Sequence, residues 1–214
     1  MFTPAKTPGA LSRVETAQKK VALTFDCAEG DQQLPLILKT LSIDHARATF
    51  FISGEWAAMY PGMTKKIAKK GHEIESLGMG DDNSRMSSDA LQNDLLMANA
   101  KISKYAKTTP QMVRPVNGKI NTQFLQTAAE LNLQAVLWSI DPPSEQQLPY
   151  PSIVKIVLEQ AGSGDVIHLC ASDQNKQTYR IVMLIIRDME NRGYQFVTLK
   201  NLIADTESKT EQLQ

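Results

Sequence analysis

The sequence has few of the features that mark specialised classes of protein. Only two of its 214 residues are cysteine, Cys27 and Cys170, so it contains no C-x-x-C pair for a metal or redox centre. It has no run of about 20 apolar residues, which excludes a helix that spans a bilayer. Basic and acidic side chains number 23 each, and this balance favours neither nucleic acid nor an anionic membrane as a partner. A carbohydrate or another neutral ligand would suit such a chain.

Both ends of the chain are polar. Residues 1–19 have no apolar segment typical of a signal peptide, and we expect a polar lead-in there. Residues 204–214 form a polar tail that we expect to fray. No linker rich in glycine, proline or serine interrupts residues 20–203, which therefore predict a single domain.

Strand-like and helix-like segments alternate along this domain. Seven segments read as strands, and a helix or a helix-length segment follows each of them. The strand-like segments are 20–25, 47–53, 72–77, 112–116, 135–140, 165–170 and 194–199. Such alternation predicts an α/β fold with a parallel sheet, either open and doubly wound or closed as a barrel.

In a parallel barrel, ligands bind at the carboxyl ends of the strands. The residues at or just after these ends are Asp26, Cys27, Ser53, Leu77, Arg114, Asp141 and Cys170. Only Asp26, Arg114 and Asp141 among them are charged. An arginine close to a buried carboxylate would keep it ionised. Spacing alone leaves open whether this is a functional pair or a structural ion pair that closes the barrel.

Five segments together resemble a known family. They are VALTFD (21–26), RATFFISGEWAAMYPGMTKKIAKKGHEI (47–74), VRPVNG (113–118), VLWSID (136–141) and GDVIHLC (164–170). The chain resembles the polysaccharide deacetylases, the NodB-homology domain of carbohydrate esterase family 4. This resemblance implies a distorted barrel of seven or eight β/α units and a divalent metal such as zinc. It also implies removal of acetyl groups from chitin-like glycans, peptidoglycan or xylan at the bacterial cell envelope.

The metal-binding positions of the family carry unusual residues here. The resemblance implies that the metal-binding aspartate corresponds to Cys27 and that the two metal-binding histidines correspond to Leu77 and Asp81. Leucine has no lone pair, and a catalytic zinc usually needs three protein ligands. We therefore expect no bound metal in this chain.

The other catalytic positions are only partly retained. The resemblance implies that Asp26 is the catalytic base and Arg114 its partner, and that the backbone of Asn117 contributes to the oxyanion hole. Asp141 is kept from the fourth motif, whereas the next two motif positions are Ser144 and Glu145. Cys170 stands where the family has its general acid, and a thiol is a poor proton donor to a leaving group. His168, two residues earlier, is interpreted as a core histidine, and His72 as one bonded to the backbone.

These replacements favour a deacetylase-like protein without deacetylase activity, a pseudoenzyme whose groove binds a cell-wall glycan or a protein. Asp26 and Arg114 would then be vestigial, in a pocket formed by Cys27, Leu77, Asp81, Asn117, Asp141 and Cys170. One alternative is an atypical metal-dependent hydrolase that uses Asp26 as base and holds a different metal with Cys27, Asp81 and Cys170. Another is a glycan-binding module with no catalytic history. The two cysteines could pair or bind a soft metal, or they could be small thiols that fill space.

Overall fold

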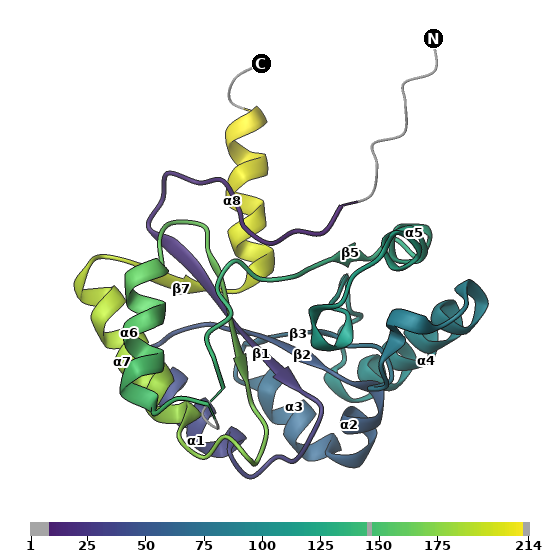
Figure 1. Ribbon diagram of the computed structural model, residues 1–214, viewed down its shortest axis with the longest axis horizontal. Helices are drawn as coiled ribbons and strands as arrows, with labels where there is room; N and C mark the ends of the chain where they lie inside the picture. The colour runs from purple at the N-terminus through teal and green to yellow at the C-terminus, as the bar shows by residue number, and fades with distance from the viewer. Residues whose placement is uncertain (1–8, 145–146, 212–214) are drawn as a thin grey trace.

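The computed structural model describes residues 9–144 and 147–211. Seven strands and eight α-helices follow one another along the described chain, and Figure 1 shows the sheet enclosed by helices. In chain order they are β1 (Lys20–Cys27), α1 (Leu34–Ile43), β2 (Thr49–Ile52), α2 (Gly54–Met59), α3 (Pro61–Lys69), β3 (Glu73–Ser76), α4 (Ser88–Ala106), β4 (Met112–Val113), α5 (Thr122–Glu130), β5 (Gln134–Ala135), α6 (Tyr150–Gln160), β6 (Val166–Cys170), α7 (Thr178–Asn191), β7 (Gln195–Val197) and α8 (Leu199–Glu211). Short 3-10 turns lie at Asn83–Arg85 and Val116–Gly118.

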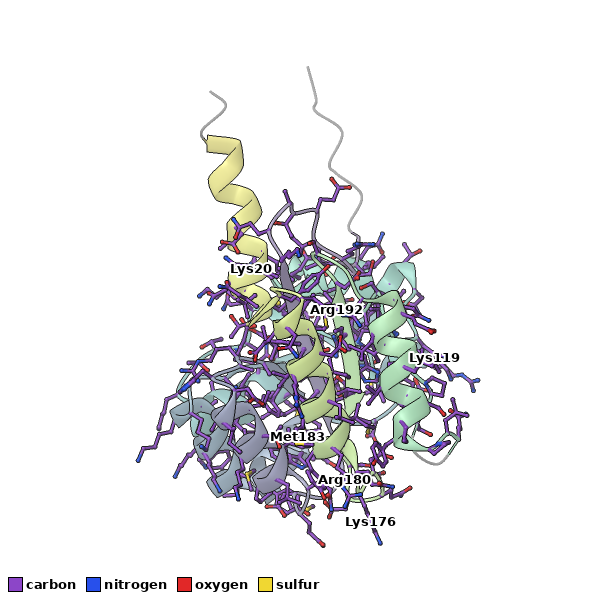
Figure 2. The ribbon with its side chains drawn as sticks, turned by 90° about the vertical axis from the view of Figure 1, so that its left-hand side faces the viewer. Lys20, Lys119, Lys176, Arg180, Met183 and Arg192 are labelled. Carbon is purple, nitrogen blue, oxygen red and sulfur yellow. The ribbon has the colours of Figure 1, made fainter. Side chains whose placement is uncertain are left out.

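The sheet confirms the predicted α/β fold with parallel strands. Its order is β5-β4-β3-β2-β1-β6, and β7 pairs with the first residues of β1. Every strand pair is parallel. The sheet curls into a half-barrel, so the carboxyl ends of its strands meet at one mouth. Figure 2 shows Lys20, at the start of β1, in the upper half of the view beside α8, with Lys176 and Arg180 at the lower end.

The alternation of β1 separates two environments. Val21, Leu23, Phe25 and Cys27 belong to the apolar cluster that the sheet forms with the surrounding helices. Thr24 and Asp26 therefore point to the inner face of the half-barrel. On β6, His168 and Cys170 are the register partners of Thr24 and Asp26, so they share this inner face. The sheet thus brings Asp26, His168 and Cys170 together on its inner face, which a second, smaller apolar cluster also occupies.

The helix starts follow the capping signals in the sequence. The Ser87 side chain accepts a hydrogen bond from the Ala90 N–H at 3.3 Å and caps α4. The Asn121 side chain accepts one from the Phe124 N–H at 2.8 Å and caps α5. In both cases a polar oxygen before the first turn satisfies a backbone donor that the helix leaves free.

The ends of the domain differ from the prediction. Helix α8 continues to Glu211, so most of the tail expected to fray is helical. In the lead-in, Leu11 forms a parallel bridge with Val136, and Arg13 forms an antiparallel bridge with Asp165. Residues 1–8 lie outside the described residues. The lead-in thus supplies backbone partners to the sheet.

The fifth strand is shorter than predicted. Regular pairing stops at Ala135, although Ile140 forms one further bridge with Ile167. Between them, the Leu137 carbonyl accepts a hydrogen bond from the Arg114 side chain at 3.1 Å. The segment also bonds to other backbone partners: the Leu137 N–H donates to the Leu11 carbonyl at 2.8 Å and the Ser139 N–H to the Val166 carbonyl at 3.0 Å. No helix among the described residues has the length and apolar character to cross a membrane.

Candidate active-site cleft

Asp26 and Arg114 form an ion pair at the mouth of the half-barrel. Arg114 Nη1 donates a hydrogen bond of 2.6 Å to Asp26 Oδ1. The arginine side chain has 0% exposure and that of Asp26 has 16%. Arg114 Nη2 also donates to Thr24 Oγ1 and to the Leu137 carbonyl, each at 3.1 Å. The guanidinium is therefore fixed by three partners, and it aims at a carboxylate that faces the cleft.

Aromatic rings enclose the guanidinium. Its central carbon lies 3.9 Å from the centre of the Phe51 ring and 5.2 Å from that of Trp138. A cation over a ring face is attracted by the electrons of the ring, and this attraction is stronger where water is excluded. Trp138 is held in turn by Gly118, where a Cβ atom would lie 2.6 Å from the tip of the indole. This packing keeps Arg114 in place.

His168 is a central member of the site, which corrects its interpretation as a core histidine. Its Nδ1 lies 2.7 Å from Asp141 Oδ1, and its Nε2 lies 3.3 Å from Asp26 Oδ2. The second contact is an ion pair without a well-aligned hydrogen bond. The imidazole also stacks on Trp138, with 4.2 Å between ring centres. Alternation along β6 could have identified it, because residues two apart on a strand share a face.

The charges shift the pKa values of this network in opposite directions. Burial alone would raise the pKa of Asp26, but Arg114 and His168 outweigh it and lower that pKa. Burial alone would lower the pKa of His168, but the charge of Asp26 and the hydrogen bond to Asp141 raise it. Burial likewise raises the pKa of the thiols of Cys27 and Cys170, and Ser172 partly offsets the effect at Cys170. The site thus favours a carboxylate beside an imidazolium, with both thiols protonated.

Two cavities open beside this network. The larger, of about 560 Å³, is lined by Asp26, Ala28, Glu29, Leu77, Gly80, Asp81, Asp82, Val116, Asn117, Trp138, Ser144, His168, Cys170, Ser172, Gln174 and Asn175. A second, of about 420 Å³, lies against Asp141, His168, Cys170 and the apolar side chains of Ile153 and Ile181. The cleft therefore contains every predicted pocket residue except Cys27.

Cys27 is not a pocket residue. Its side chain has 0% exposure and packs in the apolar cluster on the helix side of the sheet. Cys170 is exposed on the cleft side, and both thiols are free. Because the sheet lies between the two side chains, they neither pair nor face a common ligand.

The residues present do not fit the divalent metal that the family implies. Leu77 offers no lone pair, Cys27 points away from the cleft, and of the three positions only Asp81 presents a ligand atom to it. Across residues 9–144 and 147–211, no three His, Cys, Asp or Glu side chains gather closely enough to hold a metal ion. Glu145, which falls on a motif position, lies outside the described residues.

The backbone after Arg114 keeps an unusual conformation. Asn117 and Gly118 are consecutive residues with positive φ angles, 59° and 67°. Asparagine tolerates this left-handed region better than most residues, and glycine adopts it freely. The turn places Asn117 on the wall of the larger cavity. The family resemblance implies that the backbone of this residue contributes to an oxyanion hole.

His72 does not have the backbone hydrogen bonds that we expected. Neither ring nitrogen has a hydrogen-bond partner among the described residues, and the imidazole packs edge-on against Phe50 with 5.4 Å between ring centres. Burial, together with the charges of Arg47 and Lys70, lowers its pKa to about 4. The ring is therefore neutral at pH 7 and acts as a packing group away from the cleft.

Comparisons with known proteins agree with this fold and with the sequence motifs. The family model for polysaccharide deacetylase matches residues 13–136. A peptidoglycan-N-acetylglucosamine deacetylase of Bacillus cereus is 34% identical over 194 residues, which cover 89% of this chain and 91% of that protein.

Solved structures of related proteins are similar to this chain over more than nine tenths of its length. The crystal structure of the Bc1960 peptidoglycan N-acetylglucosamine deacetylase superposes with a TM-score of 0.85 at 27% identity, covering 91% of this chain and 92% of that one. The fold is also that of BA3943, described as a CE4 family pseudoenzyme from Bacillus anthracis, with a TM-score of 0.86 at 20% identity and coverage of 92% and 70%. This chain belongs to the polysaccharide deacetylase family.

Proposed function

We propose that this protein is a pseudoenzyme of the polysaccharide deacetylase family that binds a cell-wall glycan in the cleft beside Asp26. The proposal depends on the side chains at the three metal positions of the family. These are Leu77, Asp81 and Cys27, and Cys27 is buried on the face of the sheet that is turned away from the cleft. Without a Lewis acid, the carbonyl of an acetyl group is not polarised and no water is activated.

The electrostatics of Asp26 support the same conclusion. A general base works best when its pKa lies near the working pH. Arg114 and His168 instead lower the pKa of Asp26, so its carboxylate has little tendency to accept a proton. The pair therefore has a structural role, because removal of either partner would leave the other charge buried without compensation.

Among the described residues of the cleft, no proton donor is well placed for the leaving group. Cys170 replaces the general acid, and partial desolvation of its thiol by the surrounding protein raises the pKa of that thiol. His168 lies between two carboxylates, and its nitrogens face Asp26 and Asp141 rather than a free position in the cleft. Donation from either nitrogen would separate an ion pair, which opposes the transfer.

A second candidate function is a hydrolase that works without the metal site of the family. The contact of His168 with both Asp26 and Asp141 favours it, because charged groups with shifted pKa values inside a cleft are frequent in active sites. The predicted ligand set of Cys27, Asp81 and Cys170 does not support an atypical metal site, since Cys27 faces away from the other two.

Acetate release distinguishes the two functions. The purified protein would be incubated with N-acetylated chito-oligomers and with peptidoglycan, with and without added Zn²⁺, Co²⁺ or Mn²⁺. The Bacillus cereus deacetylase serves as the positive control. We expect no release above the blank from this chain. Release that depends on Asp26 would overturn the proposal in favour of a hydrolase.

Glycan binding is tested separately, by calorimetry with the same oligomers. A matched variant, Leu77→His with Asp81→His, restores the two family histidines at the metal positions that line the cleft. If the loss of ligands explains inactivity, this variant should gain metal-dependent acetate release. A variant that binds metal tightly yet stays inactive would show that other substitutions, such as Cys170, also block the reaction.

A further inference from the structure

The long helix α4 exposes apolar side chains on the side that is turned away from the core. Leu96 is 51% exposed and Met97 is 55% exposed, and Ala100 on the next turn is exposed as well. The buried side of the helix is already filled by other residues, among them Leu95 and Ile102. A surface helix usually carries polar residues on its outer side, so two large apolar neighbours there indicate a surface that another body covers.

Lysines continue this outer side of α4. On the surface of a helix, residues three and four positions apart are neighbours. Lys104 therefore lies one turn beyond Ala100, and Lys101 lies one turn beyond Met97. Helix α3 packs against α4 and adds further lysines, and we call the whole set the lysine face. It consists of Lys65, Lys66 and Lys69 of α3, Lys101 and Lys104 of α4, and Lys107 at the C-cap of α4.

No carboxylate of the same segments compensates the charge of the lysine face. Residues 56–69 and 95–107, which contain its six lysines, include no aspartate or glutamate. Within the described part of the chain, none of the six forms an ion pair. The dipole of each helix favours lysine in the last turn, as at Lys66, Lys69 and Lys104. It accounts neither for Lys65 and Lys101 nor for the exposed apolar side chains of α4.

The lysine face lies away from the mouth of the half-barrel. Helices α3 and α4 each follow the carboxyl end of one strand and lead to the start of the next parallel strand, so they run away from the mouth. The lysines begin in the middle of α3 and in the last two turns of α4. Asp26, Glu29 and Asp81 line the cleft at the mouth. The balanced totals predicted no preference for an anionic membrane, but they conceal this separation of charge.

We propose that the lysine face docks on an anionic lipid surface. Lysines near such a surface are attracted to the negative headgroups, and apolar side chains of the same patch enter the boundary between headgroups and acyl chains. A soluble polyanion would bind the lysines but would gain little from Leu96 and Met97, so this exposed pair favours a bilayer. Docked in this way, the protein would keep the mouth of its cleft away from the lipid and open to a glycan.

Sedimentation with lipid vesicles tests this docking. The full chain is mixed at low salt with vesicles of phosphatidylcholine alone, or of phosphatidylcholine with phosphatidylglycerol. We expect at least about tenfold stronger partitioning onto the anionic vesicles. This partitioning should fall as salt is added, because exposed charges are screened. Equal partitioning onto both vesicles, or none onto either, would overturn the proposal. The glycan assays contain no lipid, so such a failure would leave the proposed glycan binding in place.

Two double variants test whether the lysine face is the site of docking. Lys69→Gln with Lys104→Gln should weaken partitioning onto the anionic vesicles about tenfold. The matched control, Lys155→Gln with Lys176→Gln, removes the same charge from exposed positions on α6 and just before α7. Figure 1 shows these two helices at the left and α4 at the right, and Figure 2 shows Lys176 on the left-hand side. The control should bind as the parent protein does. Equal losses in both variants would show that net charge alone attracts the protein and would overturn the face as the site.

The apolar pair distinguishes a bilayer from a soluble polyanion. Leu96→Gln with Met97→Gln keeps good helix formers at both exposed positions, and circular dichroism would establish that the variant is folded. It should weaken partitioning at least about fivefold. Leu36→Gln with Ile43→Gln changes an exposed apolar pair on α1 and should have no effect. If the lysine variant loses binding while Leu96→Gln with Met97→Gln does not, the face binds anions in general and the lipid proposal fails in favour of a soluble polyanion.

Discussion

Removal of Asp26 or Arg114 tests the electrostatic account of the site most directly. Breaking one side of a buried ion pair costs about 3–5 kcal/mol. In the Asp26→Asn variant, Arg114 keeps its bonds to Thr24 and Leu137, and water can reach the side of residue 26 that faces the cleft. We therefore place the loss of unfolding free energy at the lower end, about 3 kcal/mol.

The reciprocal variant, Arg114→Met, removes three hydrogen bonds and leaves Asp26 with His168 as its nearest cation. It also leaves the Leu137 carbonyl without this donor. We expect a loss of about 3 kcal/mol again. The double variant should cost about 2 kcal/mol less than the sum of the two, because both single changes remove the same interaction.

Urea unfolding followed by tryptophan fluorescence measures these energies, and Trp138 beside Arg114 provides a reporter within the site. Glu130→Gln, an exposed carboxylate on α5, serves as the control and should change stability by less than about 0.5 kcal/mol. A loss below about 1 kcal/mol for Asp26→Asn, with no coupling in the double variant, would refute the reasoning.

Three further predictions concern neighbouring groups. The pKa of His168 is raised, so the stability that its charge contributes is complete below about pH 6.5 and is lost as the pH rises through the folded-state value. Unfolding free energies at pH 6 and pH 9 should therefore differ less in His168→Gln than in the parent protein. Iodoacetamide should slowly modify exposed Cys170 in the native protein and reach buried Cys27 only after unfolding, as mass spectrometry would show. Gly118→Ala should lower the unfolding free energy by about 1–3 kcal/mol in thermal unfolding, because its Cβ would lie 2.6 Å from Trp138 at a φ of +67°.

Each of these predictions has an internal control. Burial and the charge of Glu73 raise the pKa of Glu75 to about 8, so the titration of Glu75 also lowers the stability of the protein as the pH rises. The comparison of His168→Gln with the parent protein is therefore best made with Glu75→Gln present in both proteins. An unchanged pH dependence there would contradict the imidazolium. Gly62→Ala meets no atom within 4 Å and should not destabilise the protein. Rapid labelling of Cys27 would contradict its burial.

Much of the fold could be predicted from the sequence because local patterns determine it. Leu34, Ile37, Leu38 and Leu41 recur at helical spacing, and all are buried in α1. The apolar run before Asp26 predicted a strand that ends in a carboxylate, and β1 is that strand. The caps of α4 and α5 were predictable for the same reason, since a cap depends on residues only three positions apart.

The fates of Cys27 and His168 could not be predicted in this way. Cys27 follows Asp26 in the chain and was expected beside it, but alternation along β1 turns its thiol into the helix-side cluster. His168 was assigned to the core, yet the parallel register places it level with Thr24, between Asp26 and Asp141. The sequence alone determined which residues carry charge and which strands exist. The tertiary structure decided which side chains come into contact, because contact depends on strand register and on the face of the sheet to which each side chain points. For β1 and β6 this register joins residues more than a hundred positions apart in the chain.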